Sequence, residues 1–297
     1  MDPKLLFALP GNEVLTNSLA ARLNAIVGKL SMRKFPDGET YLRYEDEIAG
    51  KDVAFVCTLN DPDSKLVPLL LAADGARQLG VARIGLVSPY LAYMRQDARF
   101  HPGEVVTSQT IGALLSRHFD WLVTVDPHLH RYRALSEIYS ISTQVVHAAP
   151  AVASWIQANV TKPFLIGPDA ESAQWVKEIA DGLHVPYATL RKHRQADRVV
   201  ALEPLDLARM GDRTPVLVDD IVASGQTMIE ALKLVSGNTA TAPVCIAVHR
   251  LFADRADHQL VDMGARVVTT NTVPGTATEI ILDGSIADGI RALQVRR

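Results

Sequence analysis

The stretch Val216-Leu-Val-Asp-Asp-Ile-Val-Ala-Ser-Gly-Gln-Thr227 decides how this chain of 297 residues folds and what it can bind. Its apolar β-formers predict a buried strand that runs into Asp219 and Asp220, then a loop of small residues, then a helix. Loop amides at a helix N-terminus, here those of residues 223–227, can wrap a phosphate. Adjacent carboxylates repel each other unless a cation or sugar hydroxyls lie beside them. A parallel strand with a solvated acidic turn would share part of this pattern, but the small-residue loop and Thr227 favour a phosphorylated sugar as the ligand.

The composition is that of a globular protein. Apolar residues make up 48% of the chain, which is enough for a full core, and the length suits two domains of about 150 residues each. The formal net charge of -3 gives no electrostatic reason to expect nucleic acid or an anionic membrane as the main partner. Cys57 and Cys245 lie in apolar, strand-like runs, so we expect buried thiols in a reducing compartment.

Neither a membrane span nor a signal peptide is indicated. No apolar run approaches the ~20 residues that a helix needs to cross a bilayer. The first ten residues form a short apolar run that ends in a proline and lacks the longer apolar core of a signal peptide. We therefore expect a soluble, cytoplasmic protein.

Apolar strand patterns alternate with helical patterns almost throughout, which predicts an α/β fold with parallel sheets and crossover helices. Asn12 is a candidate N-cap for the first helix. The expected strands are 5–9, 53–58, 84–88, 121–125, 164–166, 187–190, 216–218, 244–248 and 267–269, and the expected helices are 12–27, 65–79, 108–118, 172–183, 227–235 and 285–293.

The two halves of the chain show a faint duplication. Each half has a strand that ends in a Pro turn, at Pro89 or Pro168, and a later strand that ends in an aspartate, Asp126 or Asp219. We place the boundary near residues 147–150, which gives an N-terminal domain at 1–147 and a C-terminal domain at 148–297.

Two polar segments in the first half can bind a nucleotide. Phe35-Pro-Asp-Gly-Glu39 is a turn between two extended runs and by itself predicts a hairpin. Tyr90-Leu-Ala-Tyr-Met-Arg-Gln-Asp97 follows a strand end, where ligands of α/β proteins bind. Arg95 can grip phosphate oxygens with two hydrogen bonds, and Gln96 can contact a base or a phosphate, although a solvated polar loop would look similar.

Three further segments carry candidate ligand groups. Val123-Thr-Val-Asp-Pro-His128 places an imidazole at a strand end with a carboxylate two residues before it, which suits a metal or phosphate contact better than a lone histidine would. Ile166-Gly-Pro-Asp169 ends another strand in a carboxylate. In Leu190-Arg-Lys-His-Arg194, Lys192 and Arg194 could stabilise charge on a transferred phosphate group, although a basic run is by default a solvated face.

These segments, together with Thr269-Thr-Asn-Thr-Val-Pro274, occur in an order and over a length of chain that resemble the ribose-phosphate pyrophosphokinases. The loop at 216–227 also resembles that of type I phosphoribosyltransferases, but those enzymes have no counterpart of the segment at 35–39. The resemblance implies two similar domains of type I phosphoribosyltransferase architecture, which is Rossmann-like, each with a parallel sheet flanked by helices.

The resemblance also implies a reaction, in which the β,γ-diphosphate of ATP is transferred to the 1-hydroxyl of ribose 5-phosphate, with Mg2+, to give phosphoribosyl pyrophosphate (PRPP) and AMP. It implies a homo-oligomer, because the 35–39 segment of the family usually reaches into a neighbouring subunit. The implied roles are catalysis by Lys192 and Arg194; ATP binding by Phe35, Asp37, Glu39, Arg95 and Gln96; ribose 5-phosphate binding by Asp219, Asp220, Ala223, Ser224, Gly225, Gln226 and Thr227; and metal binding by His128 and Asp169.

The chain departs from the family pattern at Ala98, Phe100, Glu171, Ala223 and Gln226. Ala98 and Phe100 replace charged residues, and Glu171 stands where a glycine would let the backbone approach a ligand closely. Two alternatives therefore remain: a type I phosphoribosyltransferase, and a non-catalytic regulatory relative of the pyrophosphokinases.

Overall fold

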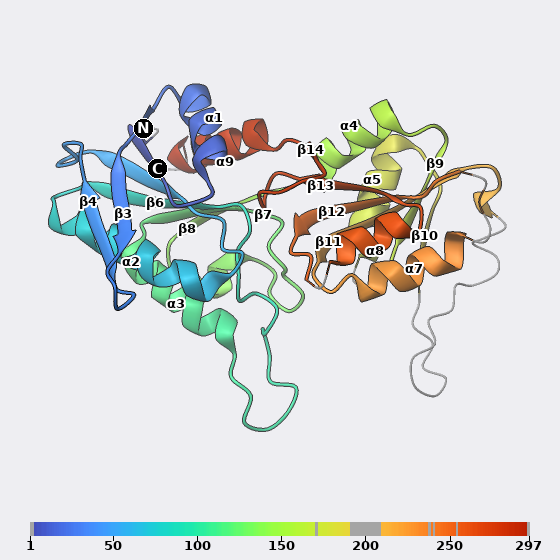
Figure 1. The fold of residues 1–297 in the computed structure, drawn as a ribbon, viewed down its shortest axis with the longest axis horizontal. Coiled ribbons are helices and arrows are strands. Elements are labelled where there is room, and N and C mark those ends of the chain that lie inside the picture. Colours follow the sequence, from blue (N-terminus) through green and yellow to red (C-terminus); the bar gives the residue numbers. More distant parts are fainter. Residues whose placement is uncertain are drawn as a thin grey trace. The chain divides into compact units, whose positions relative to one another are not determined.

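The computed structural model describes residues 3–169, 172–190, 209–236, 239, 241–253 and 255–295. The chain forms two compact units, Met1–His147 with Asp283–Arg297 (unit 1) and Ala148–Leu282 (unit 2). Each unit contains a six-stranded parallel sheet with helices on its faces (Figure 1). The predicted α/β class with two similar parallel-sheet domains is confirmed.

The sheet of unit 1 has the order β2-β1-β5-β6-β7-β8. Helices α1 and α9 lie side by side on one face, while α2 and α3 lie on the other (Figure 1). The strands are β1 (Leu5–Ala8), β2 (Ile26–Val27), β5 (Asp52–Val56), β6 (Arg83–Ser88), β7 (Trp121–Val125) and β8 (Ser142–Val146), and the helices are α1 (Glu13–Leu23), α2 (Pro62–Gln78), α3 (Thr107–His118), η1 (Leu135–Glu137, a 3-10 turn) and α9 (Asp283–Val295).

The last helix differs from expectation in its location. The predicted C-terminal domain, 148–297, included this helix, but α9 packs in unit 1 against α1, β7 and β8. Ile286 and Ile290 are buried there, and a Cβ at Gly289 would lie 2.7 Å from a methyl carbon of Val146. This close approach is possible because Gly289 has no side chain, so the end of the chain completes the core of the unit in which the chain began.

The first helix ends earlier than predicted. It stops at Leu23, because Asn24 adopts a left-handed conformation with φ of 50°, and Ala25 donates its amide to the carbonyl of Ala20. Ile26, which the predicted helix 12–27 included, instead lies in the short edge strand β2 and is 67% exposed. An asparagine in this conformation is a common helix terminator.

The sheet of unit 2 has the order β10-β9-β11-β12-β13-β14. In Figure 1, α4 and α5 cover one face and α7 and α8 the other. The strands are β9 (Pro163–Gly167), β10 (Tyr187–Thr189), β11 (Thr214–Val222), β12 (Val244–Arg250), β13 (Arg266–Thr270) and β14 (Thr278–Ile280), and the helices are α4 (Ala149–Asn159), α5 (Ala173–Leu183), α7 (Gln226–Ser236) and α8 (Ala256–Asp262).

Burial follows the apolar runs of the sequence. Val216, Leu217 and Val218 are fully buried at the centre of the second sheet, where strands covered on both faces read as continuous apolar runs. Cys57 and Cys245 are buried and free, and burial raises the pKa of each thiol to about 12. In the described part of the chain, no helix is long and apolar enough to cross a membrane.

Candidate active site

The acidic pair lies within β11, which continues to Val222 rather than ending at residue 218 as predicted. Asp219 pairs in register with Ala247 of β12. The amide of Asp220 donates to Oδ1 of Asp219 at 3.0 Å, and the amide of Ile221 donates to Oδ1 of Asp220 at 2.7 Å. Both aspartates are half-buried, so their carboxylates are held at the carboxyl end of a central strand without being sealed in the core.

A third carboxylate belongs to this cluster. Asp169 follows β9, the strand beside β11, and its Oδ1 accepts a hydrogen bond from the amide of Ser172 at 3.0 Å. Burial raises the pKa of Asp219 well above its usual range, and the charges of Asp220 and Asp169 raise it further. The structure therefore brings together the predicted metal ligand Asp169 and the predicted sugar ligands Asp219 and Asp220, in a place that favours a cation or hydroxyl donors.

The loop after the acidic pair is fixed by its backbone. Gly225 has φ of +69°, and a Cβ on it would lie 2.8 Å from the Cβ of Ala256. The amide of Leu251 donates to the carbonyl of Val222 at 3.0 Å, and the amide of Ala253 donates to the carbonyl of Ala223 at 2.9 Å. Leu251, Ala253 and Ala256 thus support the loop from behind, although no motif in the sequence marks them.

Helix α7 begins directly after this loop, at Gln226. The first amides of a helix have no acceptor within the helix, so those at the start of α7 are available to an anion. The side-chain amide of Gln226 donates to Glu230 at 2.7 Å, one turn further along. Ser224 is exposed and Thr227 is half-buried at the same end of the helix, so residues 223–227, the predicted phosphate loop, lie together at the start of α7.

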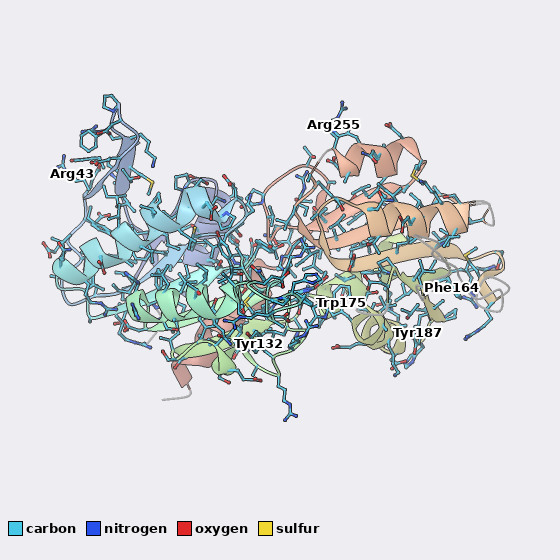
Figure 2. All side chains as sticks on the ribbon, turned by 90° about the horizontal axis from the view of Figure 1, so that it is seen from below. Arg43, Tyr132, Phe164, Trp175, Tyr187 and Arg255 are labelled. Atoms are coloured by element: carbon cyan, nitrogen blue, oxygen red, sulfur yellow. The ribbon has the colours of Figure 1, made fainter. Side chains whose placement is uncertain are left out.

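The predicted hairpin at 35–39 is confirmed. It joins β3 (Leu30–Lys34) to β4 (Thr40–Tyr44), and the amide of Phe35 donates to the carbonyl of Glu39 at 2.8 Å. Oδ1 of Asp37 accepts the amide of Glu39 at 3.2 Å. Figure 2 shows the hairpin, marked by Arg43, projecting from the helices of unit 1.

Phe35 is available for stacking at the tip of this hairpin. Its side chain is 39% exposed, and its ring meets that of Tyr41 edge-on at 6.0 Å between centroids. The guanidinium of Arg33 lies over both rings, 4.7 Å from the centroid of Phe35 and 4.3 Å from that of Tyr41. The aromatic ring is thus oriented by its neighbours while much of its surface stays in contact with solvent.

The other candidate ligands of unit 1 follow β6 and β7, which are neighbours in the sheet. Arg95 is exposed and Gln96 is half-buried on the loop after β6. His128 follows β7, and its Nδ1 lies 3.2 Å from Nε2 of His130, a neighbour that the sequence analysis did not count as a ligand. Arg95, Gln96 and His128 are therefore found at the carboxyl edge of one sheet, where the sequence placed them.

The residues that the structure describes do not include Lys192, Arg194 or Glu171, so these three predictions lie outside it. Among the described residues, no group of three His, Cys, Asp or Glu side chains could hold a metal ion by itself. Mg2+ is commonly bound by one or two carboxylates together with waters and substrate phosphates, so the all-oxygen cluster of Asp169, Asp219 and Asp220 suits that ion in its donor chemistry.

Comparison with known families agrees with this geometry. A family model for the N-terminal domain of ribose phosphate pyrophosphokinase matches residues 4–118, and a phosphoribosyl transferase domain matches residues 136–282. The chain belongs to the ribose-phosphate pyrophosphokinase family. The two matches together cover most of the chain.

Named relatives of this family match over most of their length. The ribose-phosphate pyrophosphokinase of Sulfurisphaera tokodaii is 32% identical, with 89% of this chain and 93% of the relative covered. That of Methanopyrus kandleri is 31% identical, with 94% and 96% covered. The crystal structure of phosphoribosylpyrophosphate synthetase from Mycobacterium smegmatis has the same fold, with a TM-score of 0.86 at 24% identity over 99% of this chain and all of that one.

Proposed function

We propose that this member of the ribose-phosphate pyrophosphokinase family transfers the β,γ-diphosphate of ATP to the 1-hydroxyl of ribose 5-phosphate, giving PRPP and AMP. The names of its relatives support the activity. The proposal rests on one feature of the structure. On β11 a cluster of carboxylates is followed directly by a loop that can bind an anion at the start of helix α7. A sugar phosphate presents hydroxyl donors and a phosphate at one end, and this arrangement matches both.

In the proposed complex, unit 2 holds the acceptor. The amides of residues 223–227 bind the 5-phosphate, and Asp219 and Asp220 accept hydrogen bonds from the ribose hydroxyls or contact a ribose-bound Mg2+. Because the amides of Leu251 and Ala253 hold the loop in advance, little conformational entropy is lost when the phosphate binds.

The donor would be held by unit 1. Phe35 stacks on adenine, Asp37 and Glu39 contact the base edge, and Arg95 and Gln96 bind the triphosphate. The exposure of Phe35 on a projecting hairpin fits a role at the site of a neighbouring subunit, so we propose that the protein works as a homo-oligomer.

The family implies Mg2+, and we propose His128 in unit 1 and Asp169 in unit 2 as metal ligands, each within its own unit; in unit 2 the charge of Asp169 acts on Asp219. When bound, the ion would neutralise charge on the triphosphate. The free buried thiols of Cys57 and Cys245 suit a reducing, cytoplasmic setting.

Lys192 and Arg194 are proposed to stabilise the charge that develops on the transferred diphosphate. Replacing Lys192 with Ala is expected to lower kcat about 100-fold or more, as is usual when a charged contact to a transition state is lost. The melting temperature should hardly change. A sharp fall in melting temperature would instead assign Lys192 a structural role.

Incubation of the purified protein with ATP, Mg2+ and ribose 5-phosphate separates the candidate functions. The proposal predicts AMP and PRPP in equal amounts. A phosphoribosyltransferase would instead consume PRPP and a base and release diphosphate, and a regulatory relative would form no product. The departures at Ala98, Phe100, Glu171, Ala223 and Gln226 are what make the regulatory outcome worth testing.

A further inference from the structure

Asp97 is a buried carboxylate to which neither the family comparison nor the proposed chemistry gives a role. Its side chain is 2% exposed, and its Oδ1 accepts a hydrogen bond from Nη1 of Arg131 at 2.9 Å. Its other oxygen, Oδ2, is buried with no hydrogen-bond partner in the part of the chain that the structure describes. Arg131 is 34 residues away in sequence, so this ion pair joins the loop after β6 to the loop after β7.

Two further contacts join the same loops. The hydroxyl of Tyr132 donates to the carbonyl of Asp97 at 3.2 Å and lies 3.0 Å from Oγ of Ser108, at the start of α3. The guanidinium of Arg131 also covers the ring of Phe100, 4.8 Å from its centroid. Tyr132 is labelled in Figure 2. Arg131 and Tyr132 therefore contact the chain at Asp97 and at two positions after it, Phe100 and Ser108.

Because Asp97 has Arg131 as its charged partner, the contact between the two loops depends on that arginine. A buried carboxylate with one charged partner loses its compensation when that partner is removed, and the loop that carries it must then move or take up water. When both partners are replaced by neutral groups of similar shape, no buried charge remains and the change is far milder. The residues directly before Asp97 are Arg95 and Gln96, and Arg131 follows His128 by three positions.

We propose that Asp97, Arg131 and Tyr132 form a latch between the β6 and β7 loops that positions Arg95 and Gln96 beside His128 for binding of the ATP triphosphate. This inference rests on the proposed function. Arg131 and Tyr132 are positioning residues, because they act through Asp97 and its neighbours. The latch also explains Phe100, since the exposed ring at this position is covered by the arginine that holds Asp97.

The test compares Arg131→Gln, Asp97→Asn and the double variant, each in steady-state kinetics with both substrates. Arg131→Gln should raise KM for ATP by about tenfold or more, because it leaves Asp97 buried and uncompensated. KM for ribose 5-phosphate should stay within about twofold of wild type. The double variant should recover most of the loss, since its two side-chain amides can hydrogen-bond to each other without charge.

Arg133→Gln is the matched control, because it removes the same charge from an exposed position on the same loop and should leave both KM values unchanged. Tyr132→Phe removes only a hydrogen bond between neutral groups, so it should raise KM for ATP less than Arg131→Gln does, by a few fold. An unchanged KM for ATP in Arg131→Gln would overturn the latch. A double variant no better than Arg131→Gln would also overturn it, because Arg131 would then contact ATP directly.

Wild-type protein in the same assay keeps the two proposals separate. If it forms no AMP or PRPP, the proposed function fails, and the latch is then judged by binding of a non-hydrolysable ATP analogue to the same variants. Tenfold weaker analogue binding in Arg131→Gln with recovery in the double variant supports the latch, and equal binding in all variants rejects it.

Discussion

The loop after β11 in unit 2 is held by backbone hydrogen bonds, whereas the loop after β6 in unit 1 is held by backbone hydrogen bonds at Pro89, Tyr90 and Gln96 and, in addition, by side chains at Asp97. In unit 2, two amide-to-carbonyl bonds and the left-handed Gly225 set the path of residues 223–227. In unit 1, the ion pair of Asp97 with Arg131 and the hydroxyl of Tyr132 join loops that are distant in sequence. The two loops are proposed to bind the two phosphorylated substrates of one reaction.

This difference shows which substitutions each loop can accept. A loop that presents backbone amides tolerates changes of side chain, so Ala223 and Gln226 can replace other residues without loss of the proposed phosphate contacts. It cannot tolerate a change that alters the backbone path. A loop that is tied through a buried carboxylate to one arginine is less tolerant at that contact, since the contact depends on the identity of two side chains.

The largest expected effect comes from Asp219, the buried carboxylate of the proposed sugar site. Asp219→Asn should lower kcat/KM for ribose 5-phosphate by about 100- to 1,000-fold, in line with losing one preorganised electrostatic contact. Binding of ATP should change little, because Asp219 belongs to the acceptor side. Initial rates with each substrate varied in turn measure both quantities, and normal kinetics for ribose 5-phosphate would disprove the assignment.

The same variant should stabilise the metal-free protein. Since burial and neighbouring charges raise the pKa of Asp219, the folded protein holds this proton more strongly than the unfolded chain does. The contribution of Asp219 to stability is therefore full below the ordinary carboxyl pKa and is lost as pH rises through the raised value. In EDTA, Asp219→Asn should melt at a higher temperature than wild type at neutral pH, and the difference should vanish at acidic pH.

The second effect tests the backbone-held loop. Gly225→Ala should lower kcat/KM for ribose 5-phosphate by about 10- to 100-fold, because Ala at φ of +69° is strained and its Cβ would meet Ala256. Gly182→Ala is the matched control, since a Cβ there meets nothing within 4 Å. Equal kinetics in the two variants would show that the path of the loop is not fixed as described.

The third effect concerns the donor site. Phe35→Ala should raise KM for ATP by about 10- to 100-fold, the usual effect of losing an aromatic stack on a base, and should leave KM for ribose 5-phosphate unchanged. If the hairpin completes the site of a neighbouring subunit, mixing this variant with Lys192→Ala should restore some activity. No recovery after subunit exchange would mean that one chain builds its own adenine pocket.

The smallest effect should follow changes of side chain on the phosphate loop. Ala223→Ser should alter kcat/KM for ribose 5-phosphate by less than about threefold, because it keeps the amide and the backbone path. Gains or losses beyond tenfold, measured in the same assay, would show that side chains and not the backbone govern phosphate binding there.

Much of the fold could be predicted because central strands can be recognised from their own residues. Runs such as 53–58, 121–125 and 216–218 are buried on both faces and read as continuous apolar stretches. The edge strands β8 and β14 were missed because their side chains are partly exposed and mixed in polarity. The place of α9 could not be foreseen, because it depends on contacts with residues at the other end of the chain.

The candidate site also has some contacts that the sequence predicts and others that it does not. The approach of Asp169 to Asp219 follows from a general rule, since residues at the carboxyl ends of neighbouring parallel strands meet at one edge of the sheet. The pairing of Asp97 with Arg131 follows from no local pattern, because the two residues are joined by loop conformation alone. Sequence motifs thus identified the residues proposed to touch substrate better than the residues that hold them in place.

The fate of the γ-phosphorus of ATP tests the central claim most directly. With ATP radiolabelled at that atom, together with Mg2+ and ribose 5-phosphate, the transfer of an intact diphosphate predicts that the label appears in PRPP while unlabelled AMP forms in equal amount. Label recovered as inorganic phosphate, or in a ribose bisphosphate formed together with ADP, would contradict the account.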